Sequence, residues 1–210
     1  MAKDYRDEIE AAYRLSGNTL GWRFLYSPRD ALNGARVAFI GLNPGGTVID
    51  AAHSTYAMDQ GSAYRDESWG GHVPGGSPLQ KQVLALFRML DVAPEKVLAG
   101  NLVPFRSRDW ASLTSPENSL EFGKKLWTDV LRRARPPLVI TMGALATSAI
   151  ADVVGAHAMA KHPTGWGKVT MSTGDYPGGL LVGLPHLSRF GIVTRQVGAR
   201  VLSDVFNGSK

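Results

Sequence analysis

The stretch Ala35-Arg-Val-Ala-Phe-Ile-Gly-Leu-Asn-Pro-Gly-Gly46 is a run of mostly apolar residues that ends abruptly in glycine, asparagine and proline. Its apolar residues 37–40 do not alternate with polar ones, which predicts a strand buried on both faces. Such burial is typical of parallel sheets in α/β proteins. Ligands of these sheets bind beyond the carboxyl ends of the strands. We therefore expect the functional site at the loop 41–46.

The rest of the chain alternates between short apolar runs and amphipathic segments. Strands are predicted at 37–40, 97–104, 136–143, 168–172 and 179–184, and helices at 4–15, from 78 to about 90, 115–135, 144–154 and 191–206. This alternation predicts βαβ units with right-handed crossovers. The expected fold is a three-layer α/β/α sandwich with a central, mostly parallel four-stranded sheet of order 2-1-3-4. Since no repeat or linker divides the chain, residues 1–210 are expected to form a single domain.

The composition excludes several classes of site. The chain has 210 residues, 44% hydrophobic and 20% charged, with 23 basic and 18 acidic residues and a net charge of +5. It has no cysteine, which rules out disulfides, thiolate metal sites and a cysteine nucleophile. The five histidines lack helical metal-ligand spacing, so we expect no metal and no cofactor. Without a signal peptide or an apolar run of ~20 residues, we expect a cytoplasmic monomer with no membrane association.

A long glycine-rich segment follows the first strand. Residues 47–78, which we call the lid, include seven Gly or Pro residues between Gly61 and Pro78. A loop of this length inside a compact domain is usually functional or disordered. The stretch 62–69 contains Tyr64 and Trp69, which indicates an active-site wall rather than a linker.

Three polar residues lie where predicted strands end: Asn43, Asn101 and His186. Because the carboxyl ends of parallel strands meet at one edge of a sheet, these side chains should converge on one cleft. The loop at 41–46 is neither a dinucleotide fingerprint nor a Walker loop. A plain βα turn is an equally open interpretation of this loop taken alone.

Five segments in order resemble the uracil-DNA glycosylase superfamily. Gly41-Leu-Asn-Pro-Gly45 is similar to the Gly-Ile/Met-Asn-Pro-Gly motif of its mismatch-specific and single-strand-selective branches. Gly61-Ser-Ala-Tyr64 resembles the segment whose aromatic ring stacks on uracil, and Asn101 the asparagine that reads the base edge. Pro137-Leu-Val-Ile-Thr-Met-Gly-Ala-Leu-Ala146 resembles a strand and helix of the family, and His186-Leu-Ser188 its His-Pro-Ser motif.

The resemblance implies a role for each matching residue. The catalytic residues would be Asn43, which orients water, and His186, which stabilises the departing base. The substrate-binding residues would be Gly41, Leu42, Gly45, Tyr64 and Asn101. Because a base in a duplex must be flipped out to react, residues near the cleft would also contact DNA: Ser77, Arg106, Arg108 and Ser188 at phosphates, and Arg189 or Phe190 in the gap left behind.

The chain departs from the family pattern at several positions. Leu187 replaces a proline, and aligning Pro185 instead would displace His186 from its role. His162-Pro-Thr164 imitates the last motif but precedes a strand, so His162 is predicted to be a surface loop residue. Asn43 stands where the most active branch has an aspartate, which predicts a slow enzyme because an amide is a poor proton acceptor. A lid carboxylate at position 50, 59 or 66 is an alternative water activator.

The leading hypothesis is a DNA repair glycosylase. It would hydrolyse the N-glycosidic bond of uracil and related deaminated bases in DNA, leaving an abasic site and free uracil as product. The alternative is a catalytically weak or inactive protein of the same fold that binds uracil or damaged DNA. A third hypothesis is an α/β enzyme acting on small nucleotides.

Overall fold

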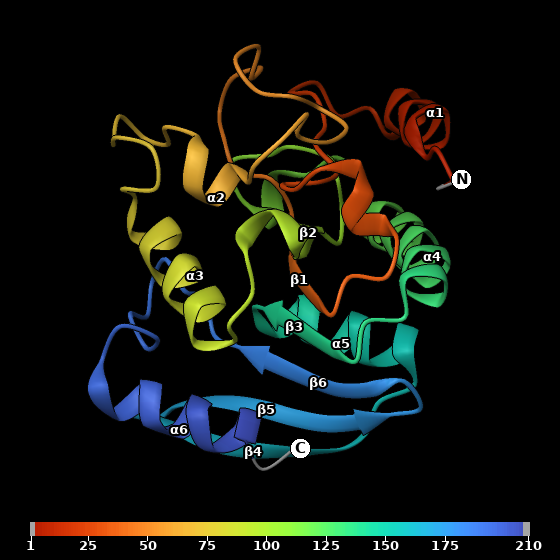
Figure 1. Ribbon diagram of the computed structural model, residues 1–210. Coiled ribbons are helices and arrows are strands. Elements are labelled where there is room, and N and C mark those ends of the chain that lie inside the picture. The colour runs from red at the N-terminus through yellow and green to blue at the C-terminus, as the bar shows by residue number, and fades with distance from the viewer. Residues whose placement is uncertain (1–2, 208–210) are drawn as a thin grey trace.

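A computed structural model describes residues 3–207. In this range the chain forms an α/β fold around a mixed six-stranded sheet, with strand order β2-β1-β3-β6-β5-β4 (Figure 1). The strands are β1 (Val37–Gly41), β2 (Leu98–Asn101), β3 (Leu138–Met142), β4 (His157–Trp166), β5 (Val169–Tyr176) and β6 (Gly179–Leu184). The first four strands in this order run parallel, whereas β5 and β4 pair antiparallel at one edge. The predicted α/β class is confirmed.

Helices cover both faces of the sheet (Figure 1). They are α1 (Arg6–Ser16), α2 (Ala63–Asp66), α3 (Pro78–Met89), α4 (Pro116–Ala134), α5 (Ala144–Val154) and α6 (Gln196–Asn207), with short 3-10 turns η1 (Arg29–Leu32), η2 (Pro94–Lys96) and η3 (Trp110–Ser112). The apolar cluster on one face contains residues of α1, α4 and α5, and the cluster on the other contains residues of α2, α3 and α6. Within residues 3–207, no helix combines the length and apolar character needed to cross a bilayer.

Strand β1 is buried on both sides, as its uninterrupted apolar run predicts. Successive side chains of a strand point to opposite faces. Ala38 and Ile40 accordingly join the cluster beneath α4 and α5, while Val37 and Phe39 join the cluster beneath α3. This burial fixes the register of β1 and so the position of the loop that follows it.

The prediction of a four-stranded sheet is wrong, because β5 and β4 extend the parallel strands to six. Strand β4 was missed because it is an edge strand with mostly exposed residues, a proline at position 163 and two register irregularities. It therefore lacks the apolar alternation that marks a strand in sequence. The expectation of a loop at His162 is also wrong: this half-buried residue lies in β4, with its Nε2 2.8 Å from Thr173 Oγ1.

Asp129 of α4 ties the N-terminal segment to the helix layer. Its carboxylate accepts hydrogen bonds from Lys3 Nζ (3.2 Å), Tyr5 Oη (3.0 Å), Arg133 Nε (3.0 Å) and Arg132 Nη2. Burial acts to raise the pKa of Asp129, but these four donors outweigh it and hold the pKa well below its usual range. A carboxyl whose pKa is lowered by folding stabilises the fold above its unfolded pKa, near ~3.9, and this stabilisation disappears in acid.

We predict that Asp129→Asn lowers the free energy of unfolding at pH 7 by about 1.5–3 kcal/mol, the range for hydrogen bonds to a charged group. The difference from wild type should shrink as the pH falls below about 4, since the wild-type carboxyl then takes up a proton in the unfolded state first. Denaturant unfolding between pH 2 and pH 7 measures this. Asp204→Asn, at an exposed position of α6, is the control. A loss of equal size at pH 2 and pH 7 would contradict the prediction.

Candidate functional site

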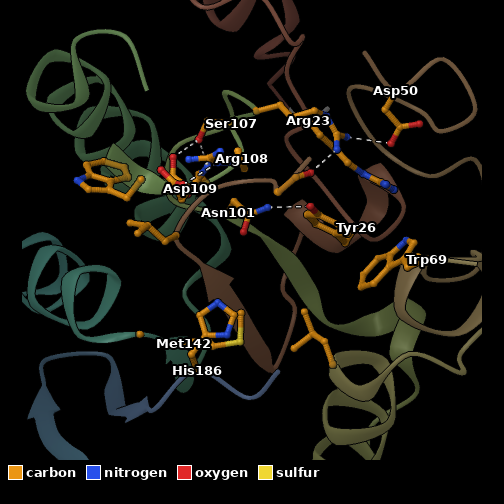
Figure 2. A pocket seen from close by; sticks show the side chains of 18 of the residues that line it. Arg23, Tyr26, Asp50, Trp69, Asn101, Ser107, Arg108, Asp109, Met142 and His186 are labelled. Atoms are coloured by element: carbon orange, nitrogen blue, oxygen red, sulfur yellow. Dashed lines mark hydrogen bonds and ion pairs between the residues drawn. The ribbon is translucent and has the colours of Figure 1, made fainter. Parts of the chain in front are cut away.

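A pocket of about 740 Å³ opens at the carboxyl ends of the four parallel strands (Figure 2). Asn43 comes from the loop after β1, Asn101 from the end of β2, Met142 from the end of β3 and His186 from the turn after β6. The volume falls within the range of ~300–1,000 Å³ typical of small-molecule sites. All four parallel strands therefore supply part of one wall.

Asn101 is fixed by two neighbours. It is 6% exposed, and its Nδ2 donates a hydrogen bond of 2.9 Å to the hydroxyl of Tyr26. Its Oδ1 lies so close to Gly41, its partner in the β1–β2 register, that a Cβ added there would be 2.3 Å away. In Figure 2 this oxygen points away from Tyr26, toward the side of the pocket that holds His186. The amide thus presents its acceptor to the pocket.

Asn43 is oriented by the loop after β2. Its Nδ2 donates to Ser107 Oγ (2.8 Å) and to the carbonyl of Pro44 (3.3 Å), and Ser107 Oγ donates in turn to the carbonyl of Asp109 (2.7 Å). These contacts use the donors of the amide. Its oxygen, which accepts no hydrogen bond from the described residues, remains an acceptor for a ligand or a water molecule.

His186 lies at the pocket mouth, beside Met142 in Figure 2. The next residue, Leu187, is buried in the apolar cluster and holds the turn in place. His186 keeps some contact with solvent, but the surrounding protein desolvates part of its imidazole, and this desolvation, with the charge of Arg189, lowers the pKa of His186 below its ordinary value. At neutral pH the ring is therefore uncharged. Ser188 Oγ lies 2.8 Å from Nδ1, so a proton donated by this hydroxyl would leave Nε2 as the N–H donor.

Aromatic side chains form the wall beside Asn101. Tyr64, in α2, is 3% exposed and stacks on Tyr26 with ring centroids 5.5 Å apart. Trp69 meets both rings edge-on at 5.3 and 5.8 Å, and Phe39 meets Tyr64 at 5.7 Å. Tyr64, expected to stack on a base, borders the pocket, but much of its ring packs against these neighbours. Tyr26 shares this wall.

A buried ion pair lies next to this aromatic wall. Arg23 and Glu67, 3% and 7% exposed, form a bidentate pair at 2.8 and 2.6 Å. Glu67 also accepts a hydrogen bond from Trp69 Nε1 (2.9 Å), and the Arg23 guanidinium carbon lies 4.3 Å from the ring centroid of Tyr26. The pair joins the segment before β1 to the lid, so it holds two sides of the pocket together.

A second ion pair closes the side near the first loop. Arg106 donates to the carbonyl of Gly45 and, at 2.9 Å, to Asp50. Asp50 also accepts from His53 Nδ1 at 2.9 Å. Burial acts to raise the pKa of Asp50, but the contacts with His53 and Arg106 outweigh it and lower the pKa. Asp50 is thus an ionised structural partner of Arg106.

The remaining predicted residues are spread around the pocket. Leu42, Gly45 and Arg108 line it, and Arg108 is exposed and paired with Asp109. Ser77, expected at a phosphate, is 7% exposed, and its hydroxyl caps α3. Arg189 is exposed, whereas Phe190 is half-buried against Trp166. Neither Asp59 nor Asp66 lines this pocket, which leaves Asp50 as the only one of the three proposed carboxylates there.

Sequence reasoning missed several residues that line the pocket, among them Arg23, Tyr26, His53 and Ser107, and it missed Glu67, the partner of Arg23. The first two precede β1, where the chain pairs with β2 through an isolated bridge between Leu25 and Gly100. The one available signal was a charged residue inside the aromatic run 22–26. A buried arginine requires a partner, but the sequence does not identify which carboxylate it is.

The fold and pocket define an α/β protein with a preformed site at the carboxyl edge of a mixed sheet. Residues 3–207 contain no group of three or more His, Asp or Glu side chains that could hold a metal ion. A scan of the chain against protein-family models gives no match, and a search of curated proteins gives no significant match.

We predict that Gly41→Ala displaces the Asn101 amide, because the new methyl group would lie 2.3 Å from Oδ1 and 3.7 Å from Met142 Cε. Overpacking of this kind costs about 1–3 kcal/mol of stability. Thermal unfolding and a crystal structure of the variant measure the two effects. Gly191→Ala, whose methyl group would make only contacts of 3.5 Å or longer, is the matched control. An unshifted Asn101 in a fully stable variant would contradict the prediction.

Proposed function

We propose that the protein is a DNA glycosylase of the uracil-DNA glycosylase type, which hydrolyses the N-glycosidic bond of uracil and related deaminated bases by base flipping. The observation that carries the proposal is the placement of Asn43, Tyr64, Asn101 and His186 around one pocket. These residues come from segments up to 143 positions apart, and each matches a segment that carries the resemblance. The proposed fold is correspondingly uracil-DNA glycosylase-like.

In the proposed reaction, a water molecule that donates a hydrogen bond to the Asn43 oxygen attacks C1′ of the deoxyribose. The bond from C1′ to the base breaks, and its electron pair leaves with the base. Neutral His186 donates a hydrogen bond to the developing anion, and such a donor is typically worth ~3–4 kcal/mol in the transition state. The attacking water loses its proton to solvent, and the departing base takes one up. The products are an abasic site and the free base.

The charge balance of the pocket favours a neutral ligand. Its three arginines are each paired with a carboxylate: Arg23 with Glu67, Arg106 with Asp50 and Arg108 with Asp109. A free nucleotide carries a phosphate, which arginine and lysine side chains bind most strongly, and the arginines of this pocket are already paired. A flipped base is uncharged, and the DNA phosphates stay outside, near exposed side chains such as Arg189. This balance supports base recognition over the hypothesis of a small-nucleotide enzyme.

The same ion pairs support a second candidate, a catalytically weak or inactive protein that binds uracil-containing DNA. Asp50 is held by Arg106 and His53, and Glu67 by Arg23, so neither carboxylate is free to accept a proton from water. Without a general base, the rate would fall by ~10²–10⁴. Binding would then persist where turnover is slow.

We expect the full-length protein to convert uracil-containing oligonucleotides to abasic sites, with slow single-turnover kinetics. Labelled single-stranded and duplex substrates carrying uracil or hypoxanthine, followed by alkaline cleavage at abasic sites, measure this. Undamaged oligonucleotides are the control. Tight, salt-sensitive binding to uracil-DNA without base release would select the second candidate. The absence of both binding and release would exclude both.

We predict that His186→Ala lowers the excision rate by about 10²–10³-fold, since it removes the donor to the departing base. Asn43→Ala should lower it by about 10²-fold through loss of water orientation. His162→Ala is a matched control, because this half-buried histidine bonds to Thr173 and does not line the pocket. Single-turnover kinetics and thermal unfolding separate chemistry from folding. Equal rates for the His186 and His162 variants would rule out the role of His186.

A further inference from the structure

Tyr26 is held more firmly than packing alone requires. Its ring lies between the Tyr64 ring, stacked at 5.5 Å, and the Arg23 guanidinium at 4.3 Å, with the edge of Trp69 at 5.8 Å. Its backbone N–H donates to the carbonyl of Ala99 (2.8 Å), and its carbonyl accepts from Ala63 N–H (2.9 Å). The position of its hydroxyl is therefore set before any ligand arrives.

The hydroxyl of Tyr26 has one partner among the described residues, Asn101 Nδ2 at 2.9 Å. In that bond the tyrosine oxygen is the acceptor, so its own proton remains available to a ligand. Burial raises the pKa of Tyr26, which keeps that proton in place at neutral pH. Because the nitrogen of Asn101 is engaged and its oxygen lies against Gly41, the amide is held in one orientation.

The pocket wall thus offers a hydroxyl donor next to an amide acceptor. An N–H beside a C=O, the lactam edge of uracil and hypoxanthine, is complementary to this pair. Cytosine and adenine carry an amino group in place of that carbonyl, and the amino group is a donor. If this amino group lay against the Tyr26 hydroxyl, two hydrogen-bond donors would face each other, and both would be buried without an acceptor.

We propose that Tyr26 is a specificity-determining residue: its hydroxyl fixes the orientation of the Asn101 amide and selects bases with a lactam edge over bases with an amino group. This inference rests on the proposed function, since it assumes that a base occupies the pocket. It does not require turnover. It also gives the substrate class a physical basis. Deamination converts the amino edge of cytosine or adenine, which Tyr26 would reject, into the lactam edge of uracil or hypoxanthine, which it would accept.

The test compares Tyr26→Phe with wild type in the affinity for free uracil and free cytosine, measured by calorimetry. Phenylalanine keeps the ring contacts with Tyr64 and Arg23 and removes only the hydroxyl. We expect wild type to prefer uracil by at least about 10²-fold, and the variant to bind uracil about tenfold more weakly and to lose most of the preference. Tyr56→Phe is the matched control: Tyr56 is buried and accepts from Tyr5 N–H (3.1 Å) but lies outside the pocket.

Base release from uracil and cytosine oligonucleotides is measured in parallel, with thermal unfolding as the check on folding. A smaller preference for uracil over cytosine in Tyr26→Phe, but not in Tyr56→Phe, supports the inference. This holds even if wild type releases no base and the proposed glycosylase activity is absent. An unchanged preference in Tyr26→Phe overturns it, even if wild type excises uracil. Wild-type binding of neither base, or of both equally, overturns it as well.

Discussion

The bidentate contact between Arg23 and Glu67 is the interaction on which the pocket depends. Removing both charges from water is costly, and only close geometry with further hydrogen bonds offsets that cost. Here both carboxylate oxygens are engaged at 2.6–2.8 Å, and Trp69 adds a donor. Because Arg23 precedes β1 and Glu67 belongs to the lid, the pair fixes the lid to the sheet. The same guanidinium covers the ring of Tyr26, so the aromatic wall depends on it too.

Under the proposed function, the pairing of every pocket arginine separates recognition of the base from binding of the DNA phosphates. Inside the pocket, paired charges leave a nearly neutral surface on which dipoles select a ligand. In the proposed function, exposed side chains outside the pocket, such as Arg189, remain accessible to phosphates. Affinity for a phosphate backbone then depends on salt, whereas recognition of an uncharged base depends on hydrogen-bond geometry. The surplus of five positive charges in the sequence is consistent with binding to phosphates.

Much of the site could be predicted because a parallel sheet places its strand ends together. That rule, applied to Asn43, Asn101 and His186, brings residues far apart in sequence to one edge. It does not apply to Tyr26, which reaches the pocket through a bridge outside the parallel strands. Arg106 was expected at phosphates, but it binds the Gly45 carbonyl and Asp50, a pairing between distant loops that local patterns do not encode. The edge strand β4 was not predicted either, because its exposed residues lack the apolar alternation that marks a strand in sequence.

The hydrogen-bond directions in the pocket constrain how any catalysis there would work. The nitrogen of Asn43 is engaged by Ser107 and that of Asn101 by Tyr26, so both amides present oxygen. His186 is the facing group whose neutral ring supplies a donor. Such a site acts through fixed dipoles rather than through proton transfer, and its effect depends on their being in position before the substrate arrives. This rigidity is established during folding by the packed rings of Tyr26 and Tyr64, the close approach at Gly41 and the buried ion pair. Little of the binding energy is therefore needed to order the site.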